Sequence, residues 1–160
     1  MAVTSVGLGT DSTIGVGNAG ETAPSGTFDT IGGMTSGTFT IEHNEVDTTN
    51  NDDNGYTSFK PGNTTMTLSA EFRFDPTDTA QGVLEDIAAD VTTGNLKALR
   101  AWIVRPLGAV SGESTWSFDG YVTSFEMNPG TNDEPVTCSI EVKATGQSVG
   151  GAAPVWALVP

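Results

Sequence analysis

Residues 64–74 carry the clearest structural pattern in the chain: Thr64-Thr65-Met66-Thr67-Leu68-Ser69-Ala70-Glu71-Phe72-Arg73-Phe74. Every second residue from Met66 to Phe74 is apolar, and the residues between them are polar. A period of two indicates a β-strand that buries one face and leaves the other polar. At ~3.3 Å per residue the strand is roughly 35 Å long, enough to line much of the wall of a small barrel.

A second stretch, from Val136 to Ala144, alternates in the same way. Further strands are predicted at residues 27–31, 38–41, 96–104 and 116–125. The chain has 20 Gly among 160 residues and only 36% hydrophobic residues, a composition that favours many short strands and turns over helices. Its length fits one domain.

One helix is predicted, at about residues 76–91. Asp75 is suited to cap it, Pro76 to occupy its first position, and Asp78 to favour its positively polarised N-terminal end. Apolar residues at helical spacing form a stripe that would cover a sheet. The stripe consists of Val83, Leu84, Ile87, Ala88 and Val91. The sequence therefore predicts a mainly β fold, sandwich-like or barrel-like, with one flanking α-helix.

The chain divides into three predicted segments. Residues 1–26, rich in Gly and Thr, are expected to form an extended arm with one or two weak strands. Residues 27–146 form the β domain, and residues 147–160 form a C-terminal tail. A long polar excursion at residues 42–62 interrupts the domain, and a loop of this length is usually functional or becomes ordered against a partner.

Both the excursion and the tail carry apolar side chains. Val46, Tyr56 and Phe59 lie in the excursion, and Val155 and Trp156 lie in the tail. Apolar residues on such segments need a covering surface. We expect that surface to be either the protein's own sheet or a neighbouring molecule.

The charge balance excludes a protein that grips nucleic acid. Six Lys and Arg residues against 20 Asp and Glu give a formal net charge of −14, with too few cations to displace counterions from phosphates. No apolar run is long enough to predict a membrane span, and the N-terminus lacks the basic and apolar regions of a signal peptide. We therefore expect synthesis in the cytoplasm.

The residues that catalysis needs are nearly absent. His43 is the only histidine and Cys138 the only cysteine. Cys138 lies in an alternating strand, where a small buried side chain is its expected role. Neither a Cys–His pair nor a metal–thiolate site is expected from these residues. We expect no enzyme activity, no metal and no cofactor.

Two short motifs match known binding loops only in part. Residues 15–20 fit the Gly-x-Gly-x-x-Gly dinucleotide pattern, but residues 21–26 do not predict the helix that this fingerprint requires. Residues 50–55 begin like a calcium loop, yet the twelfth position holds Pro61 instead of Glu. The three tryptophans suit a sugar-binding face or, more commonly for strand positions, packing in a core or an interface.

Four stretches, taken in order, carry a family resemblance. They are Ile31-Gly32-Gly33-Met34-Thr35-Ser36 followed by Glu45-Val46-Asp47-Thr48-Thr49; Gly55-Tyr56-Thr57-Ser58-Phe59-Lys60-Pro61-Gly62; Trp116-Ser117-Phe118-Asp119-Gly120-Tyr121-Val122-Thr123-Ser124-Phe125-Glu126; and the strand from Pro135 to Gly146. Each stretch is weak alone. Their order and spacing from Thr27 to Gly146, with a single helix between the second and the third, resemble the tail tube proteins of lambda-like, flexible-tailed bacteriophages.

The resemblance implies a fold and an assembly. Tail tube proteins are β-sandwich-like or barrel-like subunits with one flanking helix, and the tube protein of type VI secretion shares this plan. They form rings, usually hexameric, that stack into a hollow tube, and a long loop reaches the next ring. We therefore expect a structural protein of the virion tail tube. Its expected partners are further copies of itself, the tape measure protein and other tail proteins. DNA would pass through the tube without specific binding, and no membrane is expected as a partner.

Two sets of site residues follow for such an assembly. The polar positions of the two clear strands would face either the lumen or the outer solvent. The candidate lumen-facing residues are Thr65, Thr67, Ser69, Glu71, Thr137, Ser139, Glu141 and Lys143. The candidate inter-subunit residues are Val46, Asp47, Asp52, Asp53, Tyr56, Phe59, Val155 and Trp156. Two alternatives stay open: a monomeric β-sandwich that binds carbohydrate or acts in adhesion, and a single-ring tail component such as a terminator.

Overall fold

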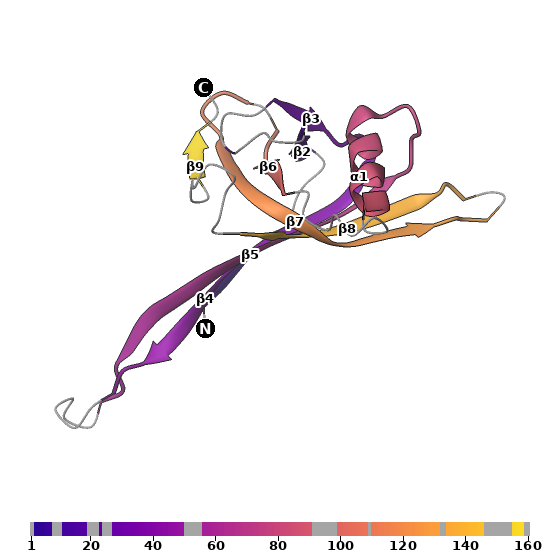
Figure 1. Cartoon of the computed structure of the whole chain (residues 1–160). Coiled ribbons are helices and arrows are strands. Elements are labelled where there is room, and N and C mark those ends of the chain that lie inside the picture. Colours follow the sequence, from indigo (N-terminus) through magenta and orange to yellow (C-terminus); the bar gives the residue numbers. More distant parts are fainter. Residues whose placement is uncertain are drawn as a thin grey trace.

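The alternating residues 64–74 lie largely within β5 (Phe59–Arg73), one strand of a continuous antiparallel sheet. The computed structural model describes residues 2–7, 11–18, 23, 27–49, 56–90, 99–108, 110–131, 134–145 and 155–158, with the backbone alone for residues 2–7, 90 and 155–158. In this part of the chain the sheet has nine strands, and one helix, α1 (Thr79–Asp90), flanks it (Figure 1). The prediction of a mainly β fold with one flanking helix is confirmed.

The strands follow one another across the sheet in a mixed sequence order. The order is β1 (Ala2–Gly7), β4 (Met34–Asp47), β5, β8 (Thr137–Ala144), β7 (Ser114–Asn128), β6 (Arg100–Arg105), β2 (Thr13–Gly17) and β3 (Phe28–Thr30), with β9 (Val155–Leu158) also paired to β7. The strands predicted at 116–125 and in the 136–144 stretch correspond to β7 and β8. The strand predicted at 96–104 is observed only from Arg100 onward, and residues 91–98 lie outside the described residues.

β7 is the strand around which the sheet curls into a half-barrel. Its first half pairs with β6, and its second half, from Gly120 to Asn128, pairs with β8. Side chains from the two halves of the sheet therefore meet in one core. Phe39 of β4 stacks on Phe118 of β7 with ring centroids 5.7 Å apart. Trp102 of β6 is fully buried and donates its indole N–H to the carbonyl of Gly120.

The alternating pattern of β5 and β8 is what builds this core. Leu68, Ala70 and Phe72 of β5 and Ile140 and Val142 of β8 are all buried on the same face. Burying a Leu or Phe side chain contributes roughly 1.5–3 kcal/mol. The opposite face of the two strands carries the polar residues.

Two strands lie within the segment expected to be an extended arm. β1 pairs with β4, and β2 lies between β3 and β6. Ile14 and Val16 of β2 are almost completely buried in the core. Gly15 and Gly17, the first glycines of the dinucleotide-like motif, are strand residues of β2, and residues 19–22 lie outside the described residues.

The helix begins later than predicted. Asp78, not Asp75, caps it, because its carboxylate accepts the backbone N–H of Gln81 at 3.0 Å. Asp75 instead closes the preceding turn by accepting the backbone N–H and the hydroxyl of Thr77, and Pro76 lies in that turn. Ala80, Leu84 and Ile87 are the buried residues of the helix, while Val83 is only partly buried and Val91 lies outside the described residues.

A buried glutamine joins the helix to the turn between β3 and β4. Gln81 is 1% exposed, and its side-chain amide donates to the carbonyls of Gly32 and Arg73 while it accepts the N–H of Asp75. Gly33 in this turn has a φ of 68° and leaves no room for a Cβ, which would lie 2.9 Å from the Arg73 carbonyl. The Gly-Gly pair of the resemblance is therefore a tight turn against which the start of the helix is anchored.

The prediction of a loop at residues 42–62 is wrong at both ends of the segment. β4 continues to Asp47 and β5 begins at Phe59, so these residues form a two-stranded hairpin that projects from the rest of the sheet (Figure 1). The hairpin has water on both faces, and its sequence therefore lacks the apolar alternation that marks the rest of β5. We call the remainder of the molecule the head.

Cys138 of β8 is buried in the hydrophobic core, as expected for a small apolar side chain. Burial, and to a smaller extent the negative charge of Glu85, raise the pKa of its thiol. The thiol therefore stays protonated at neutral pH, which makes it a poor nucleophile.

Candidate functional site

The eight candidate lumen-facing residues lie together on the face of β5 and β8 that points away from the core. The strand register places Thr67 opposite Lys143, Ser69 opposite Glu141, and Glu71 opposite Ser139. Directly opposed residues of an antiparallel pair share a face, and their neighbours in each strand point the other way. Thr65 extends this polar face along β5, and Thr137, opposite Arg73, extends it along β8. We call this surface the polar face.

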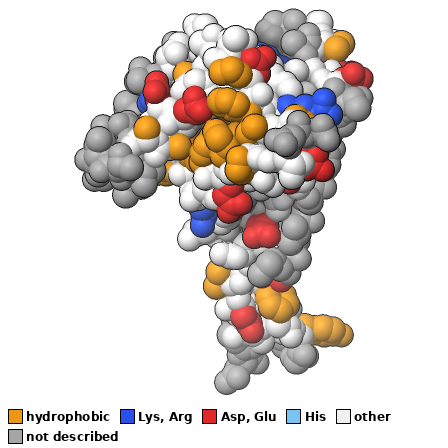
Figure 2. Space-filling model, turned by 90° about the vertical axis from the view of Figure 1, so that its right-hand side faces the viewer, with side chains coloured by type: hydrophobic (Ala, Val, Ile, Leu, Met, Phe, Trp, Pro, Cys, Tyr) orange, Lys and Arg blue, Asp and Glu red, His pale blue; other side chains and the backbone are white. Residues whose placement is uncertain are grey.

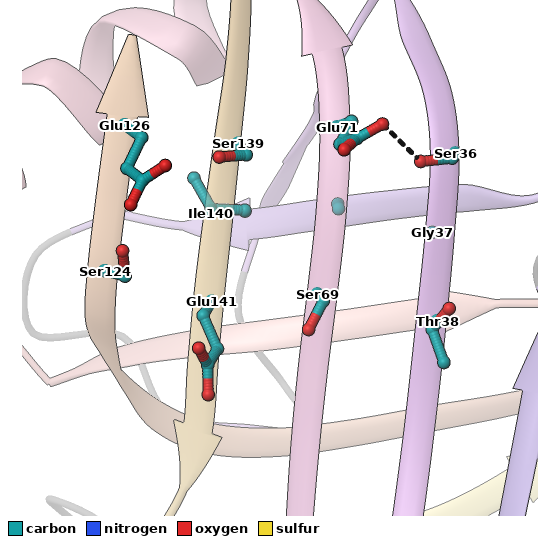
Figure 3. A pocket seen from close by; sticks show the side chains of 11 residues that line it. Ser36, Gly37, Thr38, Ser69, Glu71, Ser124, Glu126, Ser139, Ile140 and Glu141 are labelled. Carbon is teal, nitrogen blue, oxygen red and sulfur yellow. Dashed lines mark hydrogen bonds between the residues drawn. The ribbon is translucent and has the colours of Figure 1, made fainter.

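The neighbouring strands widen the polar face into a shallow concave surface (Figure 3). Thr38 and Ser36 of β4 and Ser124 and Glu126 of β7 flank the residues of β5 and β8. The resulting depression has a volume of about 350 Å³. Ser36 donates its hydroxyl to the Glu71 carboxylate at 2.9 Å, which fixes that side chain over the surface.

Sequence reasoning missed the contribution of β7 to this surface. A β-bulge between Val122 and Ser124 shifts the register, so that Ser124 faces Glu141 and Phe125 faces Ile140. Thr123, at the bulge, donates its hydroxyl to the Glu141 carbonyl at 3.1 Å. A regular strand would have put Ser124 on the same side as Val122. The available signal was the local order Ser124-Phe125-Glu126, which alternates correctly once the bulge is allowed for.

Charges are distributed unevenly over the polar face. Glu71, Glu126 and Glu141 lie at its centre, whereas Arg73 and Lys143 lie towards its two ends. The surface is open, hydrated and acidic at its middle. Such a surface repels a polyanion and offers it no cationic groove.

Within the described residues there is no cluster of three or more His, Cys, Asp or Glu side chains that a metal ion would need. His43, the only histidine, is exposed on β4 with its Nδ1 2.9 Å from the Thr64 hydroxyl. No helix of the described part has the length and apolar character that a membrane crossing requires.

The candidate inter-subunit residues of the hairpin are exposed. Val46 is 51%, Tyr56 78% and Phe59 57% exposed, although all three are apolar or aromatic. Figure 2 shows hydrophobic side chains on the hairpin, at the foot of the molecule, and again on the head above it. Exposed apolar groups on a projecting element make this surface a candidate for contacts with another molecule.

The base of the hairpin tip is held by a local hydrogen-bond network. Asp47 accepts the backbone N–H and the hydroxyl of Thr49, and these two bonds lower the pKa of its carboxyl. Thr48 donates its N–H to the Ser58 carbonyl at 2.8 Å, and Ser58 donates its own N–H to the Thr49 hydroxyl. The strands are therefore tied together up to Thr49 and Ser58.

The side chains of the other candidate contact residues lie outside the described part of the chain. Asp52 and Asp53, and the calcium-like motif that contains them, lie outside the described residues. Val155 and Trp156 belong to β9, whose backbone pairs with Ser114–Ser117 of β7. The side chains of β9 also lie outside the description.

Comparison with solved structures places this architecture among tubes. The chain is similar to the tail of an empty gene transfer agent particle, refined with C6 symmetry, at 17% identity over 88% of this chain and 95% of the other, with a TM-score of 0.66. It is similar to the SPP1 tail tube at 13% identity over 94% and 78% of the two chains, with a TM-score of 0.67. It is also similar to a chain of the sheath–tube complex of an extracellular contractile injection system, at 13% identity over 95% and 92% and a TM-score of 0.56. At these identities the likeness shows a shared fold.

The sequence itself gives the family. No curated protein matches the chain in sequence. The family model described as phage tail tube protein matches residues 8–149, which include the projecting hairpin, the helix and the strands of the polar face. The chain therefore belongs to the phage tail tube proteins, a family of structural rather than enzymatic proteins that build the tail tube of the virion.

Proposed function

We propose that six copies of this chain close into a ring, that rings stack into the tail tube, and that the polar face lines the channel through which DNA passes. The observation that carries the proposal is the two-sided sheet of β4, β5, β8 and β7. One face of it is the hydrophobic core, and the other is an open concave surface with Glu71, Glu126 and Glu141 at its centre. The sixfold symmetry of the similar gene transfer agent tail supports a ring of six.

A carboxylate-rich wall suits the transport of DNA. A phosphate backbone binds where cations displace its counterions, and it is repelled where carboxylates dominate the potential. With Arg73 and Lys143 away from the centre of the face, DNA in the channel finds no continuous track of cations. The tube would conduct the genome without retaining it.

Free strand edges support ring closure. β1 has a described partner on one side only, β4, and the second half of β7 is paired on one side only, with β8. Unpaired edges carry rows of backbone N–H and C=O groups that another chain can satisfy. An edge contact from one copy to the next is heterologous, and sixfold rotation closes it into a ring.

The hairpin supports stacking. It projects beyond the head with Val46, Tyr56 and Phe59 exposed, and we assign these side chains, with Asp47, Asp52, Asp53, Val155 and Trp156, to contacts between subunits. At the ends and along the lumen of the tube, the tape measure protein and other tail proteins are the proposed further partners.

Charge reversal on the polar face tests the channel. Glu71 and Glu141 are exposed, so the double variant Glu71→Lys/Glu141→Lys should fold and assemble into tubes. Phage carrying it should release DNA more slowly, because the wall now attracts phosphates. The measurement is the rate of DNA ejection, with tube assembly checked by electron microscopy.

Glu85→Lys/Asp86→Lys is the matched control, since both residues are exposed on α1, outside the polar face. It makes the same charge change and should leave ejection unaltered. Equal ejection rates for the wild type and the Glu71/Glu141 variant would rule out a repulsive channel wall at these residues.

A further inference from the structure

Arg105, at the end of β6, is a half-buried cation for which the described residues provide no counter-ion. No carboxylate forms an ion pair with its guanidinium anywhere in the described chain. A subunit with 20 acidic residues and only six basic ones has many carboxylates to offer to such an arginine. An arginine prefers a carboxylate that it can bind through parallel hydrogen bonds.

Two hydroxyl groups beside Arg105 also lack partners. Thr13 of β2 is paired directly with Arg105, and Thr115 precedes Trp116, the partner of Val104, so its side chain is on the Arg105 face. Thr13 Oγ1, Arg105 Nε and Thr115 Oγ1 are three of five buried side-chain polar atoms without a hydrogen-bond partner in the described residues. Unsatisfied buried polar groups destabilise a folded chain. An acceptor from outside would therefore reach the part of the Arg105 side chain that remains exposed, beyond its buried Nε.

The chain continues from Arg105 into a tight turn that displays two apolar side chains. Leu107 and Val110 are each 56% exposed. Gly108, with a φ of 76°, donates its N–H to the Arg105 carbonyl at 3.2 Å, and a Cβ at this position would lie 2.8 Å from the Asp11 carbonyl. The turn is thus held rigidly against the head. We call Arg105, Leu107 and Val110 the knob.

The hairpin matches the knob in two ways. It is acidic where the knob is cationic, and both surfaces expose apolar side chains. It presents the apolar Val46, Tyr56 and Phe59, and its strands carry Glu42, Glu45 and Asp47 against one cation, Lys60. The two surfaces are well separated in one subunit: the knob precedes the start of β7, at the top of Figure 1, and the hairpin extends to the bottom. The knob's own acidic neighbours, Asp11 and Glu113, oppose this attraction.

We propose that the knob is the docking surface for the hairpin of a second copy of this chain in the adjacent ring. Two different, complementary surfaces at separate ends of one subunit make a heterologous contact, which repeats without limit along a stack. The proposal rests on the proposed stacking of rings. It identifies the knob as the surface that binds the projecting hairpin.

Disulfide trapping tests the contact in assembled tubes. The double variant Tyr56→Cys/Leu107→Cys should form covalent chains of many subunits when tubes are oxidised, visible as a ladder on a non-reducing gel. Neither single variant should give a ladder. This control also checks that the buried Cys138 forms no cross-links. Tyr56→Cys/Glu85→Cys is the matched control, because Glu85 is exposed on α1 instead of the knob.

The outcomes separate this proposal from the stacking on which it rests. Tubes that form but give no ladder, or a ladder only with the Glu85 control, would overturn the knob while leaving the tube intact. A knob cysteine that links only to another tail protein would also overturn it. Wild-type protein that forms no tubes would instead contradict the proposed function.

A second measurement does not depend on trapping. Arg105→Gln should raise the protein concentration needed for tube formation by about tenfold, the loss expected for one charge-assisted hydrogen bond. Glu113→Gln should leave that concentration unchanged or lower it, because it removes a repulsive charge beside the knob. An unchanged threshold for Arg105→Gln would overturn the role of the arginine.

Discussion

Gln81 illustrates how one side chain can fix the relation between a helix and a sheet. Its amide donates to two backbone carbonyls, that of Gly32 in the turn between β3 and β4 and that of Arg73 at the end of β5, and accepts the N–H of Asp75. Asp78 adds a second link, because its carboxylate caps the helix and also accepts the Gly32 N–H at 2.8 Å. Such networks are strong when complete and costly when one member is removed.

Replacing Gln81 by leucine should therefore destabilise the subunit by about 2–4 kcal/mol, since three part-buried backbone groups lose their partners. Urea unfolding of the monomer measures this loss. Glu85→Gln, an exposed change on the same helix, should stay within about 0.5 kcal/mol of the wild type. If the two variants unfold at the same urea concentration, the amide does not anchor the helix.

At the scale of elements, the hairpin has a different task from the strands of the head. Its residues Val46, Tyr56 and Phe59 are exposed and contribute little to the stability of one subunit. We expect them to become buried only when subunits assemble. The triple variant Val46→Ser/Tyr56→Ser/Phe59→Ser should keep the unfolding free energy of the monomer nearly unchanged and should fail to polymerise. Urea unfolding of the monomer checks the first half of this prediction, and electron microscopy checks the second.

Asn44→Ser/Asn63→Ser serves as the control, because both asparagines are exposed polar residues of the same hairpin. It should polymerise like the wild type. Normal tubes from the triple variant would show that these side chains are not buried between subunits.

The elements that sequence predicts well are those with one buried face. β5 and β8 alternate because Leu68 and Val142 enter the core while Ser69 and Glu141 stay in water, and the same alternation identified the polar face. The extended hairpin could not be predicted, because a strand with two hydrated faces has no such pattern. The bulge after Val122 hid the contribution of β7, since it reverses the alternation within the strand.

The spacing of apolar residues also could not predict where the helix begins or that the glycine-containing strand β2 is buried. Asp75 and Asp78 are both good capping residues. Asp78 differs from Asp75 in accepting a long-range hydrogen bond from the backbone N–H of Gly32, which the local sequence does not show. β2 is a short Gly-containing strand whose burial depends on β6 and β3 beside it, so its sequence reads as a weak strand.

At the scale of the whole molecule, the subunit has one satisfied core and several unsatisfied surfaces. In the proposed tube, the strand edges of β1 and β7, the exposed hairpin and Arg105, which has no counter-ion among the described residues, would all find partners in neighbouring copies. The polar face needs no partner, because its hydroxyls and carboxylates are hydrated. A tube satisfies the first group and leaves the second facing a water-filled channel.

A helical reconstruction of assembled tubes by electron cryo-microscopy tests this arrangement most directly. The account predicts stacked six-membered rings in which Ser69, Glu71 and Glu141 face the tube axis, with each hairpin crossing to the neighbouring ring. A tube with these side chains on its outer surface would contradict it, and so would purified protein that stays monomeric at every concentration.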